Sequence, residues 1–290
     1  MAALPLIGLL VSFAILYRNV IAKLVFDWGH DDNYSHGFLI VPIALYFAWE
    51  RRERLLGAVR KPSSVGLIVL LGSLVTLFAG VLGAELFLTR VSIIGVIAGG
   101  VLYVLGWQHL RILTLPIAFL LLMIPIPAII FNQIAFPLQL QASRFGETAL
   151  TLWNIPVLRE GNVIVLANTT LEVAEACSGI RSLVSLLTLG IIYSYFSDDR
   201  QWVRVAVTLS TIPIAIVSNG LRVAGIGVAA HYYGGEVATG VLHTFSGWVL
   251  FVVAFVLLFA AMRVVQALAP VHAPVRTVAA GPHTAKEIAI

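Results

Sequence analysis

Long apolar segments alternate with short polar ones along most of the chain. A run of about 20 apolar residues is long enough to cross the hydrocarbon core of a bilayer. The pattern predicts an all-α polytopic membrane protein of about eight transmembrane helices: Leu4–Phe26, Phe38–Trp49, Ser64–Gly83, Val91–Gly106, Leu110–Phe131, Gly179–Phe196, Trp202–Asn219 and Thr244–Met262. The second of these is short and is expected to begin before Phe38. The seventh is expected to extend beyond Asn219 toward His231.

The segment between the fifth and sixth apolar runs, residues 132–176, is too polar to span a membrane. Its first part alternates polar and apolar positions in a way typical of an amphipathic helix on a membrane surface, which Pro156 is expected to end. Short extended pieces then follow, broken by Gly161 and by Asn168-Thr169. The sequence predicts a small amphipathic-helix and β cap, with extended pieces at Val157–Glu160, Asn162–Ala167 and Thr170–Ala174.

Composition supports a membrane protein. Hydrophobic residues make up 60% of the 290 residues and charged residues only 11%, whereas a soluble domain is roughly one quarter charged. The net charge of +4 reflects a scarcity of acids, so nucleic acid is not expected as a partner. The single cysteine excludes an internal disulfide and any multi-cysteine metal site, and no cofactor is expected.

Loop charges predict the orientation. The connection Glu50–Lys61 carries five basic residues and is therefore expected on the cytoplasmic side. With eight spans both termini are cytoplasmic, and the predicted cap lies on the opposite face. We expect one membrane-embedded domain over residues 1–266 and a flexible, proline-containing cytoplasmic tail over residues 267–290.

Candidate chemistry begins at Cys177, the only cysteine of the chain. Ser178 and Gly179 are typical of a helix start, where unpaired N–H groups and the positive end of the helix dipole favour a reactive thiolate. Arg181 adds a second positive charge near the same helix start. The alternative is that Cys177 is a small buried hydrophobic residue.

Two further residues fit the same chemistry. Arg222 follows an apolar run, where a charge costs about 2.5–3.5 kcal/mol at a helix centre, and His243 opens the last predicted helix. The alternatives are an interfacial anchor for Arg222 and a structural role for His243. A cysteine nucleophile needs a base, for which histidine is suited, and a donor such as arginine to stabilise an oxyanion. The predicted topology places all three residues near the outer face.

The sequence at these residues resembles the signature blocks of the exosortases, bacterial membrane cysteine transpeptidases. The resemblance extends from about residue 27 to residue 262. It rests on three main blocks, Glu175–Ser182, Asn219–Arg222 and His243–Gly247, together with Asn33–Leu39, which contains His36, Pro42, and Leu158–Asn162.

The resemblance implies a function. Substrates would be secreted proteins with a carboxy-terminal Pro-Glu-Pro signal, a transmembrane helix and a basic tail, cleaved through a thioacyl intermediate at the periplasmic face of the bacterial inner membrane. Cys177 would attack the scissile carbonyl, His243 would act as base and then acid, and Arg222 would stabilise the oxyanion or the thiolate. Membrane lipid and an acceptor of unspecified chemistry would be further partners. Supporting roles fall to Ser178, Glu175, Arg181, Asn219 and His36.

Alternative interpretations remain open at this stage. One is a transporter or a non-catalytic component of an exopolysaccharide-export assembly, and another is a membrane acyltransferase that uses the same thiol on lipid. A carrier should hold ionisable groups near the bilayer midplane, whereas here they gather toward one face. His36 and His231 are rival bases. Glu172 and Glu175 are expected to be solvated cap residues, because a carboxylate near the thiol would raise its pKa.

Overall fold

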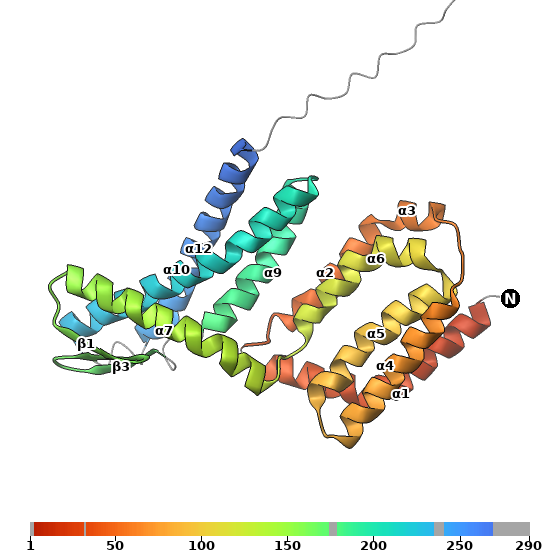
Figure 1. Ribbon diagram of the computed structural model, residues 1–290, viewed down its shortest axis with the longest axis horizontal. Helices are drawn as coiled ribbons and strands as arrows, with labels where there is room; N and C mark the ends of the chain where they lie inside the picture. Colours follow the sequence, from red (N-terminus) through yellow and green to blue (C-terminus); the bar gives the residue numbers. More distant parts are fainter. Residues whose placement is uncertain (1–2, 32, 174–178, 235–240, 269–290) are drawn as a thin grey trace, which may run out of the picture.

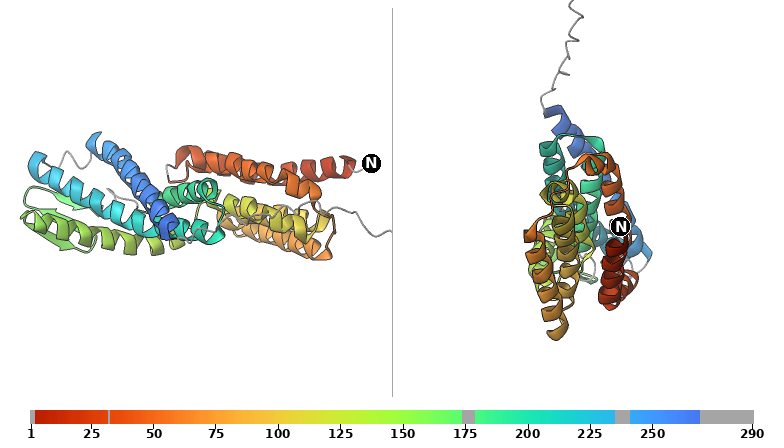
Figure 2. Two further views of the ribbon diagram at one scale, coloured as in Figure 1. Left: turned by 90° about the horizontal axis from the view of Figure 1, so that it is seen from above. Right: turned by 90° about the vertical axis from the view of Figure 1, so that its right-hand side faces the viewer.

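The computed structural model describes residues 3–31, 33–173, 179–234 and 241–268, and for residues 3–7, 9–10, 179–181 and 241–246 it describes the backbone alone. The described part is mostly helical, and its helices form two groups that lie side by side (Figures 1 and 2). This confirms a polytopic all-α membrane protein. The predicted tail lies almost wholly outside the described residues.

The first group consists of α1 (Ala3–His30), α2 (Gly37–Glu50), α3 (Arg52–Gly57), α4 (Ser64–Leu82), α5 (Leu86–Val104), α6 (Trp107–Phe119) and the 3₁₀ helix η1 (Leu120–Met123). It packs around apolar side chains from α1, α2, α5 and α6. One buried cluster, made of Tyr17, Leu77 and Ile93, joins α1 to the α4–α5 hairpin, and the buried Phe47 of α2 contacts Phe119 of α6.

Helix length and composition support fewer spans than the sequence predicts. Among the described residues, four helices are long and apolar enough to cross a membrane: α4, α5, α10 (Gln201–Tyr233) and residues Gly247–Leu268 of α12 (Val241–Leu268). A fifth is present if α6–η1 and α7 (Ala128–Leu152), which meet at 85°, count as one span. The apolar segments Gly37–Glu50 and Ser182–Ser197 are shorter, so the count of eight is not confirmed.

The predicted fifth span, Leu110–Phe131, is wrong at its end. The helix stops at Met123, and the next helix begins at Ala128 in a different direction. Pro125 and Pro127 explain the break, because proline lacks the N–H of a helical hydrogen bond and disfavours a helical conformation in the residue before it. Hydropathy does not predict this break, because both prolines lie inside an apolar run.

The carbonyl groups around the break accept hydrogen bonds from side chains at the end of α1 and in the connection to α2. A break in a helix leaves carbonyls without intrahelical donors, and these must find donors elsewhere. Three side chains donate to them: Trp28 Nε1 to Met123 O (2.9 Å), His36 Nε2 to Leu122 O (3.1 Å) and Tyr34 Oη to Ile126 O (3.4 Å).

Beyond the break, α7 lies across one end of the second helix group and carries a small sheet (Figure 1). The strands are β1 (Val157–Glu160), β2 (Val163–Leu166) and β3 (Thr170–Glu172), antiparallel in the order β1-β2-β3. The three predicted extended pieces are therefore confirmed, and the predicted amphipathic helix is α7, although it begins at Ala128 rather than after Asn132. Ile164 and Leu166 of β2 pack with Leu150 of α7 and Ile226 of α10 in one core.

The second group comprises α9 (Gly179–Ser197), α10 and α12. At 33 residues, α10 is about 50 Å long, which exceeds the roughly 30 Å hydrocarbon core. Its second half packs on α7 through glycines at which the helices approach closely. A Cβ at Gly220 would lie 2.6 Å from the Phe145 ring, and one at Gly146 would lie 2.6 Å from Val223. Larger side chains here would separate α7 from α10.

We predict that Gly220→Ala lowers the stability of the protein whereas Gly225→Ala does not. Both positions lie inside α10, where alanine is the better helix former by up to about 1 kcal/mol, but only Gly220 faces Phe145, and nothing lies within 4 Å of a Cβ at Gly225. Overpacking typically costs about 1–3 kcal/mol. Thermal unfolding in detergent measures both, and an equal effect of the two substitutions would contradict the tight α7–α10 contact.

Candidate active site

Arg222 lies on α10 and is half-buried against α12. A Cβ built at Gly247 of α12 would lie 3.9 Å from Arg222 Nη2. His243 is the third residue of α12, and positions 243 and 247 share one face of a helix because they are four residues apart. The backbone therefore places residues 243–247 of α12 toward Arg222, and His243 lies in the first described turn of the last helix.

Asn219, one turn before Arg222, is buried with a side-chain exposure of only 3%. Its Oδ1 has no hydrogen-bond partner among the described residues, and neither has Oγ of the adjacent buried Ser218. An unpaired buried polar group typically costs about 1–3 kcal/mol, so this segment of α10 retains hydrogen-bonding capacity that folding of the described residues does not use.

The same asparagine lies against the beginning of α9. Asn219 lines a small cavity together with Leu183 of α9 and Leu138 of α7. Leu183 is only six positions after Cys177 in the sequence. Helices α9, α10 and α12 also contact one another pairwise. The helices that carry the three sequence blocks therefore meet: Leu183, the fifth residue of α9, and Gly247, the seventh residue of α12, both lie near residues 219–222 of α10.

Several predicted residues lie outside this description. Glu175, Cys177 and Ser178 fall in residues 174–178, which are outside the described part of the chain, and for Arg181 and His243 only the backbone is described. The described part of α9 starts at Gly179, next to residues outside the description, so the helix start at Ser178-Gly179 stays a prediction.

His36 takes part in a different region. It precedes α2, and its Nε2 donates to the carbonyl of Leu122 at the α6–α7 junction rather than to α9, α10 or α12. Burial lowers the pKa of His36, although the carbonyls of Leu122 and Asn33 oppose this effect, so its imidazole is neutral at pH 7. In the structure, His36 thus stabilises the break between η1 and α7 by its hydrogen bond to Leu122.

The other rival base, His231, lies in the last turn of α10, where its ring stacks edge-on against Tyr232 at a centroid distance of 5.0 Å. Asn168 Nδ2 donates to the His231 carbonyl at 3.2 Å and to that of Ala230 at 3.1 Å. The loop before β3 therefore anchors the end of α10 through its backbone.

The Leu158–Asn162 block forms the hairpin turn of the sheet. Glu160 pairs with Val163, so Gly161 and Asn162 make a two-residue turn, and Gly161 adopts a φ of 65° that suits glycine. Ser143 of α7 donates to the Gly161 carbonyl at 2.9 Å. This block therefore attaches the sheet to α7. Separately, Glu172 at the end of β3 is exposed, as predicted.

Sequence reasoning missed two charged features. The first is the buried ion pair between Arg90 of α5 and Asp27 of α1, in which Asp27 also binds Lys23 at 2.7 Å. The second is a large basic cavity, to which Arg111 and Arg204 contribute from α6 and α10. In both cases the partners are far apart in sequence, so no spacing marks them. Within the described residues, no three His, Cys, Asp or Glu side chains are grouped in a way that could hold a metal ion.

Comparison with known families matches residues 28–260 to the family described as transmembrane exosortase. The matched range includes Cys177, Arg222 and His243. No curated protein and no solved structure matches the chain.

Proposed function

The chain belongs to the transmembrane exosortase family, and from this premise we propose that it is a membrane cysteine transpeptidase or protease. Its substrates would be secreted proteins that end in a Pro-Glu-Pro signal, a transmembrane helix and a basic tail. Cleavage would take place at the periplasmic face of the bacterial inner membrane. The family match also supports the resemblance on which this proposal was first based.

One observation carries the proposal: residues 219–222 of α10 lie near the beginnings of both α9 and α12. Leu183, the fifth residue of α9, shares a small cavity with Asn219, and Gly247, the seventh residue of α12, lies beside the guanidinium of Arg222. In the sequence, Cys177 comes two residues before Gly179, and His243 comes four residues before Gly247. The packing of three helices therefore supports a site that combines a thiol, an imidazole and a guanidinium.

The proposed reaction proceeds in two stages. The thiolate of Cys177 attacks the scissile carbonyl, Arg222 stabilises the oxyanion that forms, and the leaving amine departs with a proton from the imidazolium of His243. The product is a thioester between Cys177 and the substrate. An acceptor amine or hydroxyl, or water, then gives its proton to His243 and attacks the thioester, which releases the thiolate of Cys177 and restores the starting imidazolium.

Asn219 has a supporting role in this proposal. Its buried amide oxygen accepts no hydrogen bond from a described residue, so it can accept one from an N–H group of the substrate or of the segment around Cys177. Its place one helical turn from Arg222 allows both side chains to act on the same peptide.

We expect Cys177→Ala to abolish processing of a reporter that carries a Pro-Glu-Pro signal, lowering the rate by at least about a thousandfold, because no other thiol exists in the chain. Processing is followed by the mobility of the reporter, and membrane insertion and thermal unfolding of the variant serve as controls. Wild-type enzyme should yield a peptide adduct on Cys177. Continued processing by the variant, or a lipid adduct in place of the peptide, would contradict the proposal.

His243→Ala should slow thioester formation by about 10²–10⁴-fold, since it removes the general base and acid. His231→Ala is the matched control, because His231 lies at the far end of α10 with its ring on Tyr232, and this variant should react at the wild-type rate. Single-turnover labelling of Cys177 by the reporter measures both. If the His231 variant is the slower of the two, the base is misassigned.

Replacement of Arg222 by Gln should raise the pH at which Cys177 becomes alkylated. A neighbouring cation lowers the pKa of a thiol by favouring the thiolate, and its loss is expected to raise that pKa by about one unit. The rate of alkylation against pH, measured on the single cysteine, reports this shift. Arg181→Gln is the comparison, and a larger shift for that variant would give the thiolate role to Arg181 and leave Arg222 to the oxyanion.

A further inference from the structure

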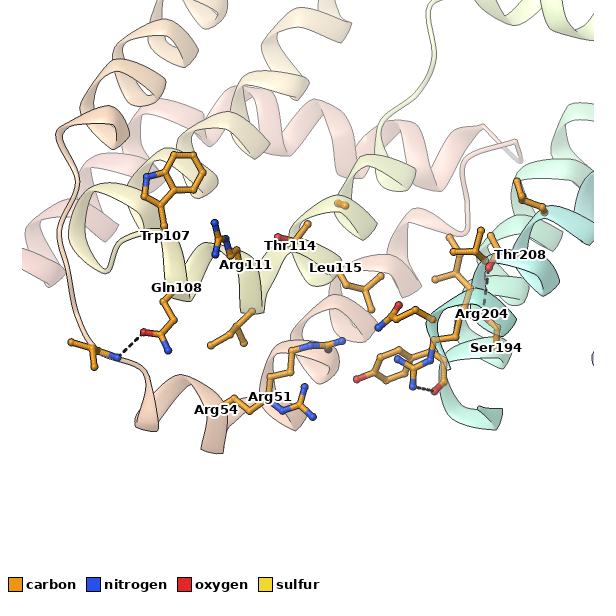
Figure 3. Close-up of a pocket in the computed structure, with 18 of the residues that line it drawn as sticks. Arg51, Arg54, Trp107, Gln108, Arg111, Thr114, Leu115, Ser194, Arg204 and Thr208 are labelled. Carbon is orange, nitrogen blue, oxygen red and sulfur yellow. Dashed lines mark hydrogen bonds between the residues drawn. The ribbon is translucent and has the colours of Figure 1, made fainter. Parts of the chain in front are cut away.

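A second site lies at the opposite end of α10, where a cavity of about 1230 Å³ opens between the two helix groups. Figure 3 shows lining side chains, and the lining comes from α3 and the residues on either side of it, from α6, from the end of α9 and from the start of α10. Its volume exceeds the roughly 300–1,000 Å³ of ordinary small-molecule pockets. Arg204 in this cavity precedes Arg222 by 18 residues, or about 27 Å of helix, which is close to the thickness of the hydrocarbon core.

The charge of the lining is uniformly positive. Among the described residues that form the wall, five are basic and none is acidic: Arg51, Arg54, Lys61, Arg111 and Arg204. Arg204 is the one member of this set that pairs with a described acid, Asp199, at 3.1 Å. At the adjoining mouth, Glu50 already accepts a hydrogen bond from Tyr195. A cluster in which basic side chains outnumber acidic ones attracts an anion.

Two of these guanidinium groups are fixed against one aromatic ring. The Cζ atoms of Arg51 and Arg204 lie 5.0 and 4.5 Å from the ring centroid of Tyr195. Main-chain carbonyls also hold both groups: Arg51 Nη1 donates to Phe47 at 2.7 Å, and Arg204 donates Nη2 to Tyr195 at 3.0 Å and Nε to Asp198 at 2.6 Å. The guanidinium donors outside these contacts can bind the oxygens of a phosphate.

The deeper wall of the cavity is apolar. Ile112, Leu115 and Ala118 of α6 face Ile191 of α9 and Leu209 of α10. The cavity thus joins a cationic rim to an apolar interior at the level where α2 ends and where α6 and α10 begin. A soluble anion uses only the rim, and a zwitterionic lipid gains little from five cations.

We infer that this cavity binds an anionic phospholipid, with the phosphate among the five basic side chains of the lining and an acyl chain along α6. Basic pockets between membrane helices are suited to anionic lipid headgroups. The same cations repel the basic tail expected for the substrate, so the cavity serves a ligand other than the substrate of the proposed reaction. This inference does not depend on Cys177 or on the proposed chemistry.

The experiment is a lipid titration of the purified full-length protein in detergent, read as bound lipid by native mass spectrometry. Phosphatidylglycerol should bind at least about tenfold more tightly than phosphatidylcholine with the same chains. The double variant Arg54→Gln/Arg111→Gln should lose this preference. Neither side chain forms a hydrogen bond or ion pair with another described residue, so the substitution leaves the described contacts intact. The matched control Arg52→Gln/Arg60→Gln removes the same charge from residues outside the lining and should keep the preference.

A second variant tests the apolar part. Leu115→Trp fills the interior without changing the charge, and it should weaken phosphatidylglycerol binding. In a separate competition on the wild type, glycerol 3-phosphate, a soluble headgroup analogue, should displace little of the bound lipid. Equal binding of the two lipids, equal losses in the lining and control variants, or displacement by glycerol 3-phosphate as effective as by lipid would each overturn the inference.

Discussion

The architecture depends on how the protein satisfies the backbone at a broken helix. Two prolines end α6–η1 and turn the chain by 85° into α7. Without the donors supplied by Trp28, Tyr34 and His36, the carbonyls at this break would stay unpaired in an apolar environment, at a cost of several kcal/mol for each group. The turn allows α7 to lie across the second helix group and to fix residues 219–222 of α10.

Helix α10 connects the two polar regions of the molecule. Its first turn carries Arg204 into the basic cavity, and its second half carries Asn219 and Arg222 to the starts of α9 and α12. Glycines at 220 and 146 bring α7 within close packing distance of this second half. Asn219 and Arg222 are thus positioned by helix packing on several sides.

Local signals in the sequence predicted what local chemistry determines. Gly161 and the Asn168-Thr169 pair marked the turns of the sheet, because turns depend on nearby residues. The break after Met123 was missed because the prolines lie inside an apolar run. The burial of Asn219 and the basic cavity depend on contacts between distant segments, which neither spacing nor hydropathy encodes.

The helix break also bears on the order in which the chain is made. Each side chain that donates to the junction precedes its acceptor carbonyl by 86 to 95 residues. During synthesis from the amino terminus, the donors have therefore left the ribosome and entered the membrane before residues 122–126 arrive. The carbonyls of residues 122–126 can therefore accept hydrogen bonds as soon as they are made. The growing chain needs no later segment to supply donors for the bend.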